Sequence, residues 1–258
     1  MPRFSANLGF LWPDRPLLDR IDAAATAGFK AVELHWPYDV PAESVRAACN
    51  DHGLVLLGLN TAIGNSDAGE FGLAALPARQ ADFEASFVQA STYARQAGAS
   101  SVHVMAGVVA PDSKADARAA LVENLTLASR MAPDLTVLLE PINQRDRPGY
   151  FYSTIAEAAD VIEAVGAGNI RIMFDVYHVG VSEGDVLKRL QRYLPIISHV
   201  QIAAVPSRAE PDEGEIAYPA IFSELDRLGY SGWVGCEYKP RASTDEGLRW
   251  LKALGTSL

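Results

Sequence analysis

The stretch Ile170-Arg-Ile-Met-Phe-Asp175 is a short, mainly apolar run that ends in a single carboxylate. A run of this length and composition is typical of a β-strand buried on both faces, as the strands of parallel sheets are. A polar residue at the end of such a strand lies outside the apolar core, at the edge of the sheet. The stretch therefore predicts a parallel sheet, with Asp175 at the edge from which the strands emerge.

Three further runs in the second half of the chain have the same form. They are Thr136-Val-Leu-Leu-Glu140, Ile196-Ile-Ser-His-Val-Gln201 and Trp233-Val-Gly-Cys-Glu237. The closing residues Glu140, Asp175, Gln201 and Glu237 follow one another at intervals of 35, 26 and 36 residues, which fits one strand–helix unit per interval. If the strands are parallel neighbours in a closed barrel, these four side chains meet on the rim where barrel enzymes carry their active sites.

Strand-like and helix-like stretches alternate along the whole chain. The expected strands are 4–8, 31–36, 54–59, 101–105, 136–140, 170–175, 196–201 and 233–237, and the expected helices are 17–27, 42–51, 78–97, 114–131, 154–165, 185–194, 219–228 and one from 246. Eight such units joined by right-handed crossovers close a barrel, so we predict an α/β fold, a (β/α)8 TIM barrel. An open doubly wound sheet is the competing architecture.

Composition sets the size and the partners of this fold. The chain has 258 residues, 49% of them apolar, which matches a single barrel domain over residues 1–258. Its net charge of −10 argues against binding to nucleic acid or to an anionic membrane surface. We therefore expect a small-molecule substrate, and an anionic one remains open because local cations and a metal can invert the field inside one pocket.

The cysteines and the amino terminus indicate a compartment. Cys49 and Cys236 are the only cysteines and form no CxxC pair, which favours a reducing compartment such as the cytoplasm. The amino terminus lacks the apolar stretch of a signal peptide, and no window reaches the length of a membrane span. We expect a soluble cytoplasmic protein without a membrane partner.

Two glycine-containing stretches have simpler interpretations than the catalytic motifs they resemble. Gly180-Val-Ser-Glu-Gly184 matches GxSxG but does not directly follow a strand, so we interpret Ser182 and Asp185 as the start of the next helix. Gly166-Ala-Gly168 precedes a strand, whereas a dinucleotide fingerprint follows one, so it is interpreted as a helix stop. Three long connections that follow strands, 61–77, 141–153 and 203–218, are expected to form the walls of an active site.

The four strand-end residues together indicate a metal site. Each alone is better explained as a helix cap or a solvent-exposed group. Three negative charges gathered near one axis would be strongly unfavourable without a cation, however. Three carboxylates and an amide oxygen suit Mg²⁺ or Mn²⁺ better than Zn²⁺.

Other polar residues lie near the same predicted rim. His178 lies three residues beyond Asp175, where a structural and a functional role are equally expected, whereas His199 is expected deeper in the barrel as a packed, hydrogen-bonded residue. Arg208 and Arg145 lie on the long loops as candidates for binding a substrate anion. His35 and His103 are expected in the pocket wall or upper core, and Trp12 and Trp36 as exposed aromatics that suit either a homo-oligomer contact or the pocket.

At these residues the chain resembles the hydroxypyruvate isomerase family of the xylose isomerase-like barrel superfamily, over essentially its full length. The stretches that carry the resemblance are Leu139-Glu-Pro-Ile-Asn143, Arg145-Asp-Arg-Pro-Gly-Tyr150, Phe174-Asp-Val-Tyr-His178, His199-Val-Gln-Ile-Ala203, Pro206-Ser-Arg-Ala-Glu-Pro211 and Gly235-Cys-Glu-Tyr238. The resemblance implies that Glu140 and Glu237 are metal ligands and also the acid/base pair. It also implies that Asp175 and Gln201 complete the metal site.

The activity implied is isomerisation of a small oxo-hydroxy acid, hydroxypyruvate to tartronate semialdehyde, through an enediolate. His178 and Arg208 would then hold the substrate. The first alternative is a 2-oxo-tetronate isomerase, and the second is a ketose 3-epimerase, although those enzymes use a His where this chain has Gln201. Endonuclease relatives carry more metal-binding histidines, and the negative charge of this chain also argues against them. A barrel that binds a metal or a sugar acid without catalysis is the alternative from another class.

Overall fold

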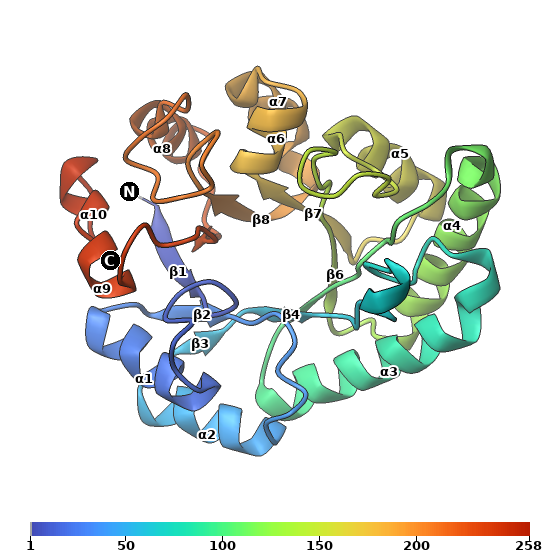
Figure 1. The fold of residues 1–258 in the computed structure, drawn as a ribbon, viewed down its shortest axis with the longest axis horizontal. Coiled ribbons are helices and arrows are strands. Elements are labelled where there is room, and N and C mark those ends of the chain that lie inside the picture. Colours follow the sequence, from blue (N-terminus) through green and yellow to red (C-terminus); the bar gives the residue numbers. More distant parts are fainter. Residues whose placement is uncertain (1) are drawn as a thin grey trace.

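Parallel strands form the centre of the molecule and helices surround them (Figure 1). The computed structural model describes residues 2–258. The strands are β1 (Arg3–Asn7), β2 (Ala31–Glu33), β3 (Val55–Leu56), β4 (Gly58–Asn60), β5 (Ser101–His103), β6 (Thr136–Leu139), β7 (Ile170–Asp175), β8 (Ile197–Ile202) and β9 (Trp233–Cys236). Every pairing between them is parallel. The predicted (β/α)8 barrel is confirmed.

The barrel closes through a single extended segment. The strand order is β3-β2-β1-β9-β8-β7-β6-β5-β4, and its two ends, β3 and β4, are consecutive pieces of chain separated by Leu57. The amide of Leu57 donates to the carbonyl of Val32 at 2.8 Å, while its carbonyl accepts from the amide of Ser101 at 3.0 Å. The predicted strand 54–59 is therefore divided at the point where it changes neighbour, and eight strand segments surround the axis.

The helices form the outer layer (Figure 1). They are α1 (Leu17–Ala27), α2 (Ala42–Asp51), α3 (Gln80–Ala97), α4 (Lys114–Met131), α5 (Ile155–Val165), α6 (Val176–Ser182), α7 (Val186–Tyr193), α8 (Tyr218–Arg227), α9 (Thr244–Gly247) and α10 (Trp250–Ala253). Short 3-10 turns are η1 (Ser66–Ala68), η2 (Pro77–Arg79), η3 (Pro111–Ser113) and η4 (Leu194–Ile196). Within residues 2–258 no helix has the length and apolar character needed to cross a membrane.

Helix α6 was not expected from the sequence and corrects one interpretation. It begins directly after β7 because the side chain of Asp175 accepts a hydrogen bond from the amide of Tyr177 at 2.8 Å and so caps the first turn. Ser182 is the last residue of α6 and does not cap the following helix. Asp185 precedes α7 but makes no side-chain capping bond. The interpretation of Ser182 and Asp185 as the start of a helix by capping was therefore wrong for both side chains.

The end of the chain packs against β1 through Trp250. Its ring packs edge-to-face on Phe4 of β1 at 5.3 Å between centroids, and its indole N–H donates to the hydroxyl of Tyr238 at 3.0 Å. The predicted last helix is divided into α9 and α10. Trp12, expected to be exposed, is buried, with its indole N–H donating to Asp245. The C-terminal segment therefore covers the aromatic ring that the sequence had suggested for a subunit contact or for the pocket.

Helix α5 offers a test of local stability. Thr154 and Glu157 form a reciprocal capping box, in which each side chain accepts a hydrogen bond from the backbone amide of the other. Thr154→Ala is expected to lower stability by about 1 kcal/mol, which corresponds to roughly 2–4 °C in Tm for a domain of this size. Thr154→Ser keeps the acceptor and is the matched control in thermal unfolding. Equal Tm values for the Ala and Ser variants would contradict the expectation.

Candidate active site

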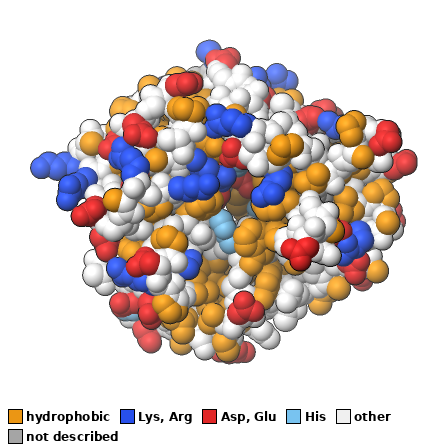
Figure 2. All heavy atoms as spheres, viewed as in Figure 1, with side chains coloured by type: hydrophobic (Ala, Val, Ile, Leu, Met, Phe, Trp, Pro, Cys, Tyr) orange, Lys and Arg blue, Asp and Glu red, His pale blue; other side chains and the backbone are white. Residues whose placement is uncertain are grey.

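A cavity of about 610 Å³ opens at the carboxyl ends of the strands. In Figure 2, which views the molecule as in Figure 1, the centre of the face is hollowed, a histidine side chain is visible inside, and Lys and Arg side chains gather near its edge. Five of the six site residues predicted from the sequence line this cavity, namely Glu140, Gln201, Glu237, His178 and Arg208. The sixth, Asp175, is fully buried beside them.

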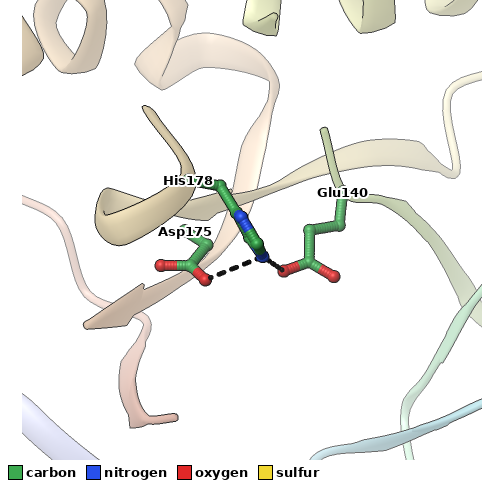
Figure 3. A group of neighbouring side chains, drawn as sticks. All are labelled: Glu140, Asp175 and His178. Atoms are coloured by element: carbon green, nitrogen blue, oxygen red, sulfur yellow. Dashed lines mark ion pairs between the residues drawn. The ribbon is translucent and has the colours of Figure 1, made fainter. Parts of the chain in front are cut away.

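The ends of β6 and β7 bring two of the predicted ligands together. Glu140 directly follows β6, and Asp175 is the last residue of β7. Figure 3 shows both carboxylates and the ring of His178 pointing toward one another. One oxygen of each carboxylate and one ring nitrogen of His178 all lie within 4.8 Å of one another.

Three buried oxygens in this region have no hydrogen-bond partner among the described residues. They are Oε1 of Glu140, Oδ2 of Asp175 and Oε1 of Gln201. Buried acceptors are almost always paired in folded proteins, so each of these oxygens requires an explanation. All three belong to the predicted ligand set, and hard oxygen donors of this kind suit Mg²⁺ or Mn²⁺. The side chains present therefore fit a divalent cation.

The other two predicted ligands are joined by hydrogen bonds. The amide nitrogen of Gln201 donates to Oε2 of Glu237 at 2.5 Å and to Oε2 of Glu33 at 2.9 Å. Oε2 of Glu237 also accepts from the side-chain amide of Asn7 at 2.7 Å, while its Oε1 accepts from Arg208 at 2.9 Å. Glu237 is thus held in place by three donors, which come from three different parts of the chain.

The three predicted carboxylate ligands differ in how well nearby positive charge compensates them. Burial, together with Glu237 and Asp175, raises the pKa of Glu140 well above its ordinary value. Burial and then Glu237 raise the pKa of Asp175 to about 7. Burial alone would also raise the pKa of Glu237, but His35 and Arg208 outweigh it and lower this pKa to about 2. Within residues 2–258 no Lys or Arg forms an ion pair with Glu140 or Asp175, so among the three predicted carboxylate ligands these two lack a Lys or Arg partner.

His178 is held as a neutral hydrogen-bond donor. Burial, followed by the nearby Arg208, lowers the pKa of His178 to about 3. Its Nδ1 accepts from the backbone amide of Asn143 at 3.2 Å, which assigns the single ring proton to Nε2. Nε2 lies 3.7 Å from Oε1 of Glu140 and 3.6 Å from Oδ2 of Asp175. The ring therefore presents an N–H group to the cavity beside the two uncompensated carboxylates.

Arg208 is fixed above Glu237 by charge and by aromatic rings. Its guanidinium donates to Oε1 of Glu237 at 2.9 Å and to Asp146 at 3.3 Å. The same group lies 4.9 Å from the ring centroid of Phe10 and 5.0 Å from that of Tyr177. Its Nε is buried and has no partner among the described residues. Arg208 thus keeps an unused donor within the cavity wall.

The remaining polar residues lie where the sequence placed them. His199 is buried and hydrogen-bonded to Glu33 at 2.9 Å, which confirms its expected packed position. His35 and His103 line the cavity, as does Arg145, whose guanidinium donates to the hydroxyl of Tyr177. The loops 61–77, 141–153 and 203–218 all contribute lining residues, so they form the cavity walls as predicted.

Two site residues were missed in the sequence. Asn7 closes β1 and Glu33 closes β2, so both occupy the same strand-end position as the four predicted ligands. Each is hydrogen-bonded to a predicted ligand: Asn7 donates to Glu237, and Glu33 accepts from Gln201. Both positions are strand ends only in the structure, because the predicted strands 4–8 and 31–36 extended beyond them.

Comparison with known proteins places this site in a family. Residues 21–254 match the model of the xylose isomerase-like TIM barrel. The chain is 48% identical to the 2-oxo-tetronate isomerase of Cupriavidus necator, covering 98% of each protein. It is 38% identical to the hydroxypyruvate isomerase of Escherichia coli, covering 97% of this chain and 98% of that one. A crystal structure described as an AP endonuclease of family 2 from Brucella melitensis superposes with a TM-score of 0.94 at 39% identity, covering 98% of each chain.

Fold and site together define an enzyme of the xylose isomerase-like barrel class. The two curated relatives just described are named a 2-oxo-tetronate isomerase and a hydroxypyruvate isomerase. The chain belongs to the hydroxypyruvate isomerase family, which includes the 2-oxo-tetronate isomerases, and it is an isomerase. The family resemblance predicted from the sequence is confirmed.

Proposed function

We propose that this enzyme isomerises a small oxo-hydroxy acid with the help of Mg²⁺ or Mn²⁺. Glu140, Asp175, Gln201 and Glu237 would hold the cation. The observation that carries the proposal is the set of three buried, unpartnered oxygens on three of these residues. When bound, the cation would polarise adjacent carbonyl and hydroxyl oxygens of the substrate and so acidify the C–H bond between them.

The two glutamates supply the proton transfers. Glu140 follows β6 and Glu237 follows β9, and β7 and β8 lie between these strands in the sheet. The two carboxylates therefore approach the cavity from different sides. One would take the proton from the first carbon and the other would give a proton to its neighbour, while the hydroxyl proton would move to the former carbonyl oxygen, as an aldose–ketose isomerisation requires.

His178 and Arg208 are suited to hold the substrate. The Nε2–H of His178 can donate to a substrate oxygen near Glu140, because Asn143 fixes the ring in that tautomer. Arg208 has its unpartnered Nε available for a carboxylate, and stacking on two aromatic rings restricts its motion. Arg145, Arg147 and Lys239 also line the cavity and favour an anionic substrate in a chain that is acidic as a whole.

Two substrates of this class are candidates. The greater identity to a 2-oxo-tetronate isomerase, 48% against 38% for a hydroxypyruvate isomerase, favours the four-carbon 2-oxo-tetronate. The three-carbon hydroxypyruvate is the second candidate, and it was the first choice from the sequence. Both are small against a cavity of about 610 Å³, so the cavity volume does not discriminate between them.

Turnover in D₂O with Mn²⁺ tests both the activity and the substrate. We expect one solvent deuterium in the product, and a kcat/KM about tenfold or more higher for the four-carbon acid than for hydroxypyruvate. A reversed ratio would make the enzyme a hydroxypyruvate isomerase. Neither deuterium nor product from either acid would indicate a binding protein, and deuterium in free ketoses would indicate an epimerase.

A further inference from the structure

Glu33 is a buried carboxylate outside the predicted ligand set. It ends β2, is 5% exposed, and within residues 2–258 forms no ion pair with Lys or Arg. Its Oε1 accepts from the hydroxyl of Ser5 at 3.2 Å. Its Oε2 accepts from Nε2 of His199 and from the amide nitrogen of Gln201, both at 2.9 Å. A buried charge with this many dedicated donors is costly to build, so its role requires an explanation.

The barrel wall is shaped to let Glu33 reach these partners. In the sheet β1 and β9 lie between β2 and β8, so the side chain of Glu33 crosses two strands to contact Gln201. The residues it passes are small, Ser5 on β1 and Gly235 on β9. A Cβ atom on Gly235 would lie 2.0 Å from Oε1 of Glu33 and 2.9 Å from Nε2 of His199. Any larger residue at position 235 would displace the carboxylate.

The contact fixes which end of the Gln201 amide faces the cavity. A glutamine side chain carries two N–H hydrogens and one oxygen, and a flip of the amide exchanges their places. Here both hydrogens are donated to carboxylates, one to Glu33 and one to Glu237. The oxygen, Oε1, is buried and has no partner, so it is the atom left for a cation. A flipped amide would instead present N–H hydrogens to the cation and turn its oxygen toward the two carboxylates, each of which would lose one donor.

We infer that Glu33 is a positioning residue that holds the amide of Gln201 with its oxygen toward the cation. The inference rests on the proposed function, because it assumes the cation site. Groups that orient metal ligands typically change metal affinity by 10- to 100-fold when they are removed. His199 would act with Glu33, since its N–H occupies the same carboxylate oxygen and keeps that oxygen in place.

A titration of the full chain with Mn²⁺ tests this role without any substrate. The electron paramagnetic resonance signal of the free ion measures how much Mn²⁺ remains unbound. Glu33→Ala is expected to weaken Mn²⁺ binding about 10- to 100-fold. Glu33→Gln keeps an acceptor oxygen for Gln201 but removes the charge, so its Kd is expected to stay within about threefold of the wild type. If Glu33→Gln and Glu33→Ala lost affinity equally, the charge of Glu33 would be acting directly on the cation, and the inference would be wrong.

A double-mutant cycle shows whether Glu33 acts through Gln201. In a Gln201→Ala background, Glu33→Ala is expected to change the Kd for Mn²⁺ by less than about twofold, because no amide remains to be oriented. The same loss in both backgrounds would overturn the inference. Circular dichroism checks the fold of each variant, and Glu33→Met, which retains side-chain length without an acceptor, replaces Glu33→Ala if that variant does not fold.

The controls separate this inference from the proposed function. If the wild-type protein binds no Mn²⁺, the proposed cation site itself fails. If the wild type binds Mn²⁺ and Gln201→Ala weakens binding while neither Glu33→Ala nor Glu33→Met does, the cation site stands and only the role of Glu33 is refuted.

Discussion

Replacement of Glu237 by Gln is expected to lower kcat by about 10²- to 10⁴-fold while the barrel remains folded. The amide oxygen can still accept from Arg208, which donates to Oε1 at 2.9 Å, whereas the amide nitrogen takes the place of Oε2, which accepts from Asn7 at 2.7 Å. The amide cannot accept a proton from carbon or return one to it. Steady-state kinetics at saturating Mn²⁺ would measure the loss, and Glu84→Gln on the exposed side of α3 is the matched control.

Solvent exchange separates the roles of the two glutamates. In a two-base mechanism, one glutamate can still exchange the substrate proton with D₂O when the other is replaced. We therefore expect one of the variants Glu140→Gln and Glu237→Gln to incorporate deuterium into recovered substrate without forming product, while the other incorporates none. A normal turnover rate for Glu237→Gln with bound metal would show that the two-base assignment is wrong.

The barrel was predictable because its strands are short and apolar and end in polar residues. The stretch from Ile170 to Asp175 has this form, and β7 has the same bounds. The division of 54–59 into β3 and β4 was not predictable, because it depends on which neighbour each half pairs with. Local spacing carries no information about which neighbouring strand each half would pair with.

The limits of the sequence are clearest at Asp175. Its position predicted either a helix cap or a metal ligand, and these were treated as alternatives. In the structure Oδ1 caps α6 while Oδ2 is buried and has no partner among residues 2–258. A carboxylate has two oxygens, so one residue can meet both demands. The sequence shows only that an aspartate is present. It does not show that one carboxylate oxygen caps the helix while the other is free for a cation.

Glu33 and Asn7 show why part of the site was missed. Their importance depends on contacts that cross the barrel, to Gln201 on β8 and to Glu237 after β9. These contacts need small neighbours such as Gly235, whose relevance appears only when the strands are side by side. Strand-end position identified the candidates in the second half of the chain, but the partners of each candidate required three-dimensional structure.

Asp175→Asn is expected to stabilise the metal-free protein while removing its response to metal. The asparagine oxygen can still accept from the amide of Tyr177 and so retain the cap of α6. The substitution removes one of the two predicted carboxylate ligands that have no Lys or Arg partner, which relieves repulsion with Glu140. We expect a gain of about 1–2 kcal/mol, or roughly 2–8 °C in Tm, in the presence of a chelator.

Addition of Mn²⁺ should then reverse the order of stability. A ligand present at 100 times its Kd stabilises the native state by about 2.7 kcal/mol, so the wild-type Tm is expected to rise with Mn²⁺. The Tm of Asp175→Asn should rise much less, because a neutral amide replaces one of the charged ligands. Asp160→Asn, on the exposed side of α5, controls for the change in net charge. A metal-free Tm equal to or below that of the wild type, together with an undiminished Mn²⁺ shift, would mean that Asp175 serves only as the cap of α6.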